Sequence, residues 1–204
     1  MEVANIVAID IVILPPRGVS KTAVSLNKEI NNRYFSLGTS DYMPHMSLAM
    51  AYVDSLEEVG KVLWAIVAKT KPLKITLNKI MSKRMQPGWG GGRVQNLWNV
   101  ERNNSLWELH KALVGSLPYV DVPKQPEMSF VDGENVSRLA MEYVAGFRFK
   151  NSGENYWPHV TLGNGDNEID KELKKEFICS EIVLAQLGDF CTVRRVLARF
   201  NLGS

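Results

Sequence analysis

One short phrase occurs twice in this chain, as YMPHMSL at residues 42–48 and as YWPHVTL at residues 156–162. The two copies hold two of the chain's three histidines, His45 and His159, and each histidine is followed two positions later by a hydroxyl residue, Ser47 or Thr161. Histidine both accepts and donates protons near neutral pH. One imidazole can therefore deprotonate an attacking oxygen while the other protonates a departing one. Hydroxyl groups can donate hydrogen bonds to the non-bridging oxygens of a phosphate. These four side chains suit acid–base chemistry at a phosphorus atom.

The repeated phrase is more specific than either copy alone. A single strand histidine beside a hydroxyl residue is more often structural than catalytic. Duplication would preserve packing residues such as the shared proline and leucine, but it gives no reason to keep both histidines. We therefore interpret His45 and His159 as catalytic. His110 has Ala112 two residues later and falls beside the apolar face of a predicted helix, so we interpret it as structural. The histidines and the two cysteines lack metal-ligand spacing, and we expect neither a metal nor a cofactor.

The first phrase is expected on a strand within a unit of five elements. Residues 5–14 are rich in β-branched side chains and predict a strand, residues 20–34 have helical spacing, and residues 46–53 predict the strand that follows His45. Asp54 and Glu57 have capping-box spacing before a helix that ends near residue 69, and residues 73–81 alternate as a strand. Side chains two positions apart on a strand share a face, so His45 and Ser47 should point the same way.

The second half of the chain repeats this order. It predicts a strand at 94–100, a helix capped by Asn103 or Asn104, a strand at 159–163, a helix at 168–177 built on Ile169, Leu173 and Phe177, and closing strands at 181–187 and 193–202. An insertion at about 118–155 contains a helix near 136–143. The repeat indicates an α+β fold of two pseudo-two-fold β-α-β-α-β lobes, about 1–92 and 93–204, with antiparallel-rich sheets flanking a central groove. Because the halves are expected to share sheets, residues 1–204 form one domain.

The paired motifs resemble those of the 2H phosphoesterase superfamily, also described as LigT-like or as the RNA 2′,5′-ligase and cyclic phosphodiesterase family. The matching residues are His45-Met46-Ser47-Leu48 and His159-Val160-Thr161-Leu162. The resemblance implies a metal-independent phosphodiesterase that acts on a nucleotide or RNA phosphodiester, namely a 2′,3′-cyclic phosphate, a 2′,5′-linked oligonucleotide or a cyclic nucleotide. Two alternatives stay open. One is a nucleotide- or RNA-binding module without turnover, and the other is an RNA 2′,5′-ligase that runs the same transesterification in reverse.

Aromatic residues beside the histidines are candidate substrate contacts. Tyr42 and Tyr156 each precede a histidine by three positions, where they can stack on a base or reach a phosphate. The alternative is that each ring fills the space under a loop. Trp157 has Met43 as its counterpart in the first copy, so we interpret it as a candidate for base recognition on one side only.

Basic side chains provide candidate phosphate partners. The loop 86–93 contains Trp89 and ends at Arg93, and we expect these two residues to contact a ligand, with Arg84 as a further candidate and an ordinary hairpin loop as the alternative. In the last hairpin, either Arg194 or Arg195 can turn toward the groove.

The composition is that of an ordinary globular protein, with 45% hydrophobic and 23% charged residues and a net charge of +2. Between Lys61 and Lys111 there are ten basic residues and two acidic ones, which favours a small anionic ligand or a solvated face. The apolar run 6–14 is too short to span a bilayer and Asp10 interrupts it. Cys179 and Cys191 indicate no disulfide framework. We expect a cytoplasmic monomer that binds a nucleotide or a short RNA and no membrane.

Overall fold

The computed structural model describes residues 6–30, 35–38, 42–84, 94–131 and 133–203. It contains the helices α1 (Arg17–Glu29), α2 (Leu56–Val67), α3 (Asn104–Ser116) and α4 (Arg138–Lys150). The strands are β1 (Val7–Ile13), β2 (Met46–Val53), β3 (Leu73–Arg84), β4 (Val94–Val100), β5 (His159–Gly165), β6 (Lys171–Cys179), β7 (Glu181–Leu187) and β8 (Val193–Asn201). The mixed fold of helices and antiparallel strands agrees with the predicted class.

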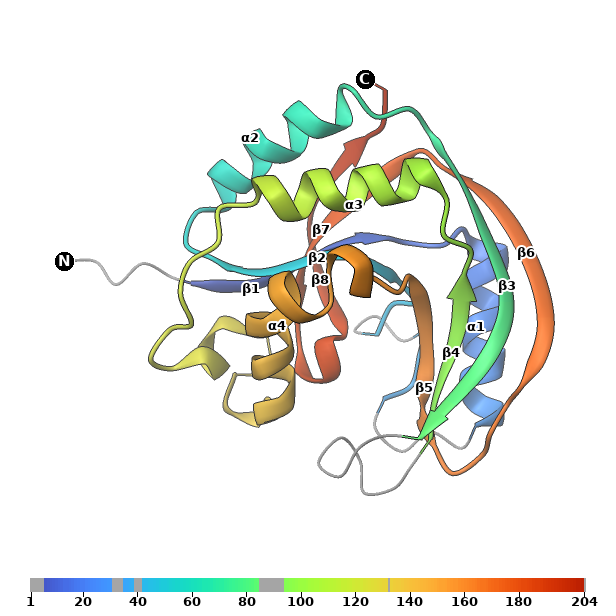
Figure 1. Ribbon diagram of the computed structural model, residues 1–204. Coiled ribbons are helices and arrows are strands. Elements are labelled where there is room, and N and C mark those ends of the chain that lie inside the picture. Colours follow the sequence, from blue (N-terminus) through green and yellow to red (C-terminus); the bar gives the residue numbers. More distant parts are fainter. Residues whose placement is uncertain (1–5, 31–34, 39–41, 85–93, 132, 204) are drawn as a thin grey trace.

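All eight strands belong to one antiparallel sheet with the order β6-β3-β4-β5-β2-β1-β7-β8. The sheet curls, so that β3 and β6 curve around one side of the molecule while β1, β2 and β7 lie near its centre (Figure 1). The strands that carry the two phrases, β2 and β5, meet in the middle of the sheet through the pair Met46 and Val160. The two histidine motifs are therefore neighbours, as the predicted pseudo-symmetry requires.

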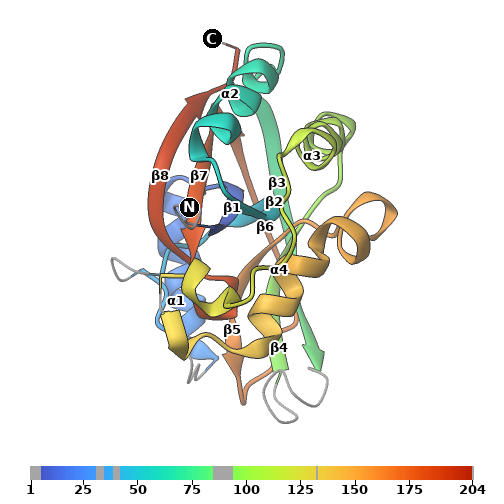
Figure 2. The same cartoon turned by 90° about the vertical axis from the view of Figure 1, so that its left-hand side faces the viewer.

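The two halves of the sequence are interleaved in the sheet. β3 precedes residue 92, yet it pairs with β4 and β6, and β7 follows residue 93, yet it pairs with β1. The helices also cross over, because α1 packs on β5 and α3 packs on β2. Figure 2 shows α2 and α3 near one end of the molecule and α1 beside β5. The division near residue 92 thus marks a repeat in the sequence and does not separate the sheet.

The helix boundaries follow from local capping groups. Ser55 caps α2 by accepting a hydrogen bond from the backbone N–H of Glu58 at 3.2 Å, so the N-cap lies one residue later than the predicted Asp54. Of the two predicted caps, Asn103 is the one that caps α3, by accepting from the N–H of Leu106 at 2.9 Å. α1 begins at Arg17, three residues before the predicted start. In the insertion, α4 extends seven residues beyond the predicted end and packs on β2.

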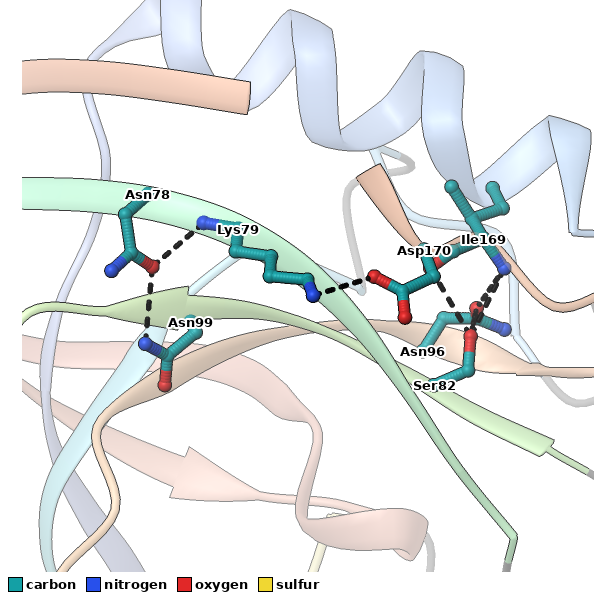
Figure 3. Close-up of polar contacts among 7 residues, drawn as sticks. All are labelled: Asn78, Lys79, Ser82, Asn96, Asn99, Ile169 and Asp170. Atoms are coloured by element: carbon teal, nitrogen blue, oxygen red, sulfur yellow. Dashed lines mark hydrogen bonds and ion pairs between the residues drawn. The ribbon is translucent and has the colours of Figure 1, made fainter. Parts of the chain in front are cut away.

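The predicted helix at 168–177 is wrong, because residues 171–179 form the edge strand β6. Leu173 and Phe177 are four residues apart, and an even spacing also places side chains on one face of a strand. Charged side chains protect this exposed edge. Figure 3 shows how the preceding segment is held: the N–H of Ile169 donates to Asn96 Oδ1 at 2.9 Å and to Ser82 Oγ at 3.0 Å. Lys79 of β3 forms an ion pair with Asp170 at 3.1 Å.

Candidate functional site

The two motif histidines are held in the same way. The Nδ1 atoms of His45 and His159 each lie 2.8 Å from a backbone carbonyl oxygen, that of Met43 and that of Trp157 respectively. In each case the carbonyl belongs to the residue before the phrase's proline. A carbonyl oxygen only accepts hydrogen bonds, so Nδ1 carries the proton, and in the neutral ring Nε2 is the nitrogen that can accept one. Each phrase therefore presents an imidazole with its acceptor nitrogen defined.

All four predicted catalytic side chains line one cavity of about 540 Å³. His45 and Ser47 enter it from β2 and the residues just before it, and His159 and Thr161 enter it from β5. The cavity is of the size that accommodates a small-molecule ligand. The arrangement brings the two sequence motifs, which are far apart in the chain, onto one surface.

The environment of the histidines favours their neutral forms. The pKa of His45 is lowered to about 4: burial is the main cause and the charge of His159 adds to it, while the backbone groups of Met43 and Cys191 act in the opposite direction. Burial also lowers the pKa of His159, which the carbonyl of Trp157 counteracts and the charge of Lys83 reinforces. Because each positive charge near the rings disfavours a second one, the ligand-free site disfavours two imidazolium ions together.

Asp10 lies beneath Ser47, and the sequence reasoning missed this role for it. The Ser47 hydroxyl donates to Asp10 Oδ2 at 2.6 Å, and Asp10 is fully buried in β1. Among the described residues, Asp10 Oδ1 has no hydrogen-bond partner. Burial raises the pKa of Asp10 well above its usual range, although the hydrogen bond with Ser47 acts in the opposite direction. A single acid within the apolar run 6–14 was the signal that could have identified this site residue.

The three aromatic residues of the phrases occupy different environments. Tyr156 is only 6% exposed, its ring stacks on His110 with centroids 3.7 Å apart, and its hydroxyl donates to the carbonyl of Ser47 at 3.0 Å. Tyr156 also lines the cavity, so its contact with a substrate stays a prediction. Trp157 is 37% exposed at the cavity rim, where its Nε1–H donates to Asn99 Oδ1 at 2.5 Å. Asn99 is in turn fixed by Asn78 Oδ1 at 3.1 Å (Figure 3).

Tyr42 also lines the cavity and belongs to an aromatic cluster. Its ring stacks on Phe35 with centroids 5.8 Å apart, and Phe35 contacts Phe190 at 6.4 Å. The guanidinium of Arg194 lies 4.5 Å from the centre of the Tyr42 ring, which is within cation–π distance. Of the two arginines in the last hairpin, Arg194 is therefore the one that contacts a residue lining the cavity.

The basic side chains at the cavity include residues that the sequence reasoning did not single out. Lys83 and Arg84 line it from the end of β3, and Lys150 lines it from the end of α4. Lys83 Nζ also lies 5.7 Å from the centre of the Trp157 ring. The predicted contacts Trp89 and Arg93 lie outside the described residues. Among the residues that the structure describes, no three His, Cys, Asp or Glu side chains gather as metal ligands.

A strained turn between β7 and β8 also borders the cavity. Phe190 and Cys191 have φ angles of 56° and 53°, in the left-handed region that residues other than glycine seldom adopt. Asp189 stabilises this turn by accepting from the N–H of Phe190 at 2.8 Å and from the Ser137 hydroxyl at 2.6 Å. Such strain persists where surrounding contacts hold it, and it is found often at functional sites. Cys191, like Cys179, is a buried free cysteine.

Comparison with known proteins identifies the fold. No family model and no curated protein matches this sequence. Among solved structures, TT0787 of Thermus thermophilus is similar, with 16% identity, a TM-score of 0.61 and 97% and 98% of the two chains covered. E. coli LigT in complex with NADP⁺ is similar at 13% identity and a TM-score of 0.54, with 98% of this chain and 99% of that chain covered. A structure described as a phosphoesterase has 14% identity and a TM-score of 0.51, with 96% and 98% covered. The expected LigT-like fold is therefore confirmed over nearly the whole chain.

Proposed function

We propose that this protein is a 2H phosphoesterase that hydrolyses a nucleotide or RNA phosphodiester without a metal. The observation that carries this proposal is the matched geometry of His45 and His159: each donates from Nδ1 to the carbonyl two residues before it, and both line one cavity. Two such histidines supply both proton transfers that the displacement of an alcohol from phosphorus requires.

In the proposed reaction, Nε2 of His45 accepts a proton from water as the water oxygen attacks phosphorus. The bond between phosphorus and the leaving oxygen breaks, and Nε2–H of His159 donates its proton to that oxygen. We assign the base to His45 because burial and the charge of His159 lower its pKa to about 4, so that it stays neutral at physiological pH. A second proton exchange with water restores the starting forms of both rings.

The acid must be protonated when the substrate is bound. A phosphodiester carries a negative charge, and an anion close to an imidazole raises its pKa. Substrate binding therefore favours a proton on one ring of the pair, whereas the charge of Lys83 lowers the pKa of His159 in the empty site. The negative charge of the bound substrate therefore favours the state with one neutral and one protonated histidine, which the reaction requires.

The hydroxyls of Ser47 and Thr161 are proposed to donate to the non-bridging phosphate oxygens. The Ser47 proton is directed at Asp10 in the structure. When the Asp10 carboxyl holds a proton, this hydrogen bond reverses and the Ser47 proton becomes available to the phosphate. Gln95 of β4 has the position beside Thr161 that Asp10 has beside Ser47. Asp10 lies two residues before Val12, which pairs with Ser47, and Gln95 lies two residues before Leu97, which pairs with Thr161. An amide is neutral and can donate, as a protonated carboxyl can.

The rims of the cavity support a nucleotide as the substrate class. Both Trp157, which is partly exposed, and Tyr42, which lies within an aromatic cluster, line the cavity. Bases stack on such rings, and Lys83, Arg84 and Lys150 provide positive charge for phosphates. LigT, which shares this fold, has been solved with NADP⁺, with 3′-AMP and with ATP.

The proposal is tested by turnover in EDTA of 2′,3′-cyclic nucleotides, 2′,5′-oligoadenylate and cyclic dinucleotides. We expect wild-type protein to cleave at least one class, and His45→Ala and His159→Ala each to reduce that rate by about 10²–10⁴-fold. Retained turnover in both variants would contradict the two-histidine mechanism. Binding of nucleotides by wild-type protein with no turnover of any substrate would instead support the binding module.

A further inference from the structure

Each of the two strands that carry the phrases, β2 and β5, has a β-bulge at the leucine of its own motif. Along β1 and β2, Ile11 pairs with Ala49 and Val12 pairs with Ser47, so Leu48 is skipped. Along β4 and β5, Asn96 pairs with Gly163 and Leu97 pairs with Thr161, so Leu162 is skipped. Leu48 and Leu162 each directly follow the hydroxyl residue of a motif. A bulge bends the strand and redirects the neighbouring side chains.

Each bulged leucine carbonyl accepts a hydrogen bond from a buried side chain of a helix. His110 Nδ1 of α3 lies 2.7 Å from the carbonyl oxygen of Leu48, and Asn27 Nδ2 of α1 lies 2.6 Å from that of Leu162. A bulged residue leaves the regular ladder, and its buried carbonyl then needs another donor. His110 is 0% exposed and Asn27 is 4% exposed, so these donors replace solvent.

The other polar atom of each side chain holds the segment that leads into a phrase. Asn27 Oδ1 accepts from the backbone N–H of Leu37 at 3.1 Å, eight residues before His45. His110 Nε2 accepts from the N–H of Gly153 at 3.3 Å, six residues before His159. His110 is therefore neutral with its proton on Nδ1, and burial together with the charge of Arg102 lowers its pKa, against the effect of the Leu48 carbonyl.

The connections are reciprocal. His110 joins the bulge of the first phrase to the approach of the second, and Asn27 joins the bulge of the second phrase to the approach of the first. This exchange follows from the crossed packing of the helices, since α1 lies on β5 and α3 lies on β2. An amide and a neutral imidazole can both act as one donor and one acceptor, which these two places require.

We propose that Asn27 and His110 are a matched pair of positioning residues that couple the two histidine motifs. We call each of these side chains, with its two hydrogen bonds, a clamp. Loss of either clamp should disturb the geometry of both motifs. The role in turnover rests on the proposed function, whereas the coupling of geometry does not. A displacement of about 1 Å of a reacting group can reduce the rate about 100-fold. Loss of either clamp should therefore lower kcat by about 10- to 100-fold with a smaller change in KM.

The test uses the imidazole signals of the full-length protein in ¹H–¹⁵N NMR, because only three histidines are present. His110→Phe keeps a ring against Tyr156 but removes both hydrogen bonds, and Asn27→Leu removes both bonds of the other clamp. We expect each variant to shift the ring signals of both His45 and His159. Ser55→Ala, which removes the side-chain cap of α2 away from both motifs, should shift neither.

His110→Asn separates the two arms of the clamp. Its amide nitrogen can take the place of Nδ1 and donate to Leu48, but it has no atom at the place of Nε2. We expect the His45 signals to return toward their wild-type positions while those of His159 remain shifted. Unchanged signals in His110→Phe and Asn27→Leu would overturn the proposal, as would shifts of equal size in Ser55→Ala. Absence of wild-type turnover would contradict the proposed function alone, because the NMR signals still report the coupling.

Discussion

The hydroxyl of Tyr156 donates to the backbone carbonyl of Ser47 at 3.0 Å, and it thereby joins the start of the second phrase to the middle of the first. Tyr156 also stacks on His110, which holds the neighbouring carbonyl of Leu48. Two residues of the second half of the sequence, Tyr156 and His110, thus hold the backbone of the first motif by hydrogen bonds to consecutive carbonyls. This explains why an aromatic residue stands three positions before His159 although its ring is buried.

Tyr156→Phe removes this hydrogen bond and keeps the stacked ring. Loss of a buried hydrogen bond that leaves a carbonyl unsatisfied costs about 1–3 kcal/mol, so urea unfolding should show a decrease of this size. We expect a lower kcat as well, because Ser47 loses its support. Tyr119→Phe is the matched control: its buried hydroxyl has no hydrogen-bond partner among the described residues, so its removal should leave stability unchanged or raise it.

The buried acid Asp10 makes a prediction about the pH dependence of stability. Its pKa is raised in the folded protein, so the folded state holds a proton that the unfolded state releases. The stability associated with this proton is complete below the pKa of the unfolded chain, about 4, and is lost as the pH rises through the folded pKa. Asp10→Asn removes this titration. The free energy of unfolding of Asp10→Asn relative to wild type should therefore increase between pH 4 and pH 8.

Asp10 also makes a prediction about activity. Asp10→Asn retains a donor for Ser47 and should keep turnover within about tenfold of wild type, whereas Asp10→Leu removes the donor and should lose about 10²-fold or more, the scale of losing one positioned donor. Equal loss of activity in both variants would contradict this account and would show that turnover requires a charged carboxylate at this position. Steady-state kinetics of the two variants at pH 7 distinguishes these outcomes.

Lys83 makes a prediction about the second histidine. Its positive charge lowers the pKa of His159, and it is not among the groups that shift the pKa of His45. Lys83→Met should raise the pKa of His159 and change that of His45 less, as measured by NMR titration of the imidazole signals. The variant should also bind phosphodiesters more weakly and with a smaller dependence on salt, because one cation at the cavity is removed. A shift confined to His45 would contradict this account.

The sequence predicts the parts of the fold that depend on local pattern. The strands that carry the phrases, the central position of those strands and a helix cap at Asn103 or Asn104 are all confirmed. The error at 168–177 has a local cause, since apolar residues at intervals of four satisfy a strand as well as a helix. A single pattern of this kind cannot distinguish the two without knowledge of the neighbouring strand.

The contacts around the site could not be predicted from the sequence, because they depend on register and on packing between distant segments. Asp10 meets Ser47 only because β1 pairs with β2 across a bulge. His110 was interpreted as structural, and its burial agrees with this, but its two partners come from β2 and from the segment before Tyr156. Asn27 gave no signal in the sequence, since an asparagine within a helix is usually exposed.

The most direct test of the account is a comparison of leaving groups. A nucleoside 4-nitrophenyl phosphodiester releases a weakly basic oxygen that needs no proton, whereas a natural phosphodiester releases an alkoxide that does. We predict that His159→Ala loses about 10²–10⁴-fold with the natural substrate but stays within about tenfold of wild type with the nitrophenyl ester. His45→Ala should lose activity with both, because the attacking water still needs a base. Equal losses of both variants on both substrates would contradict the division of acid and base between the two histidines.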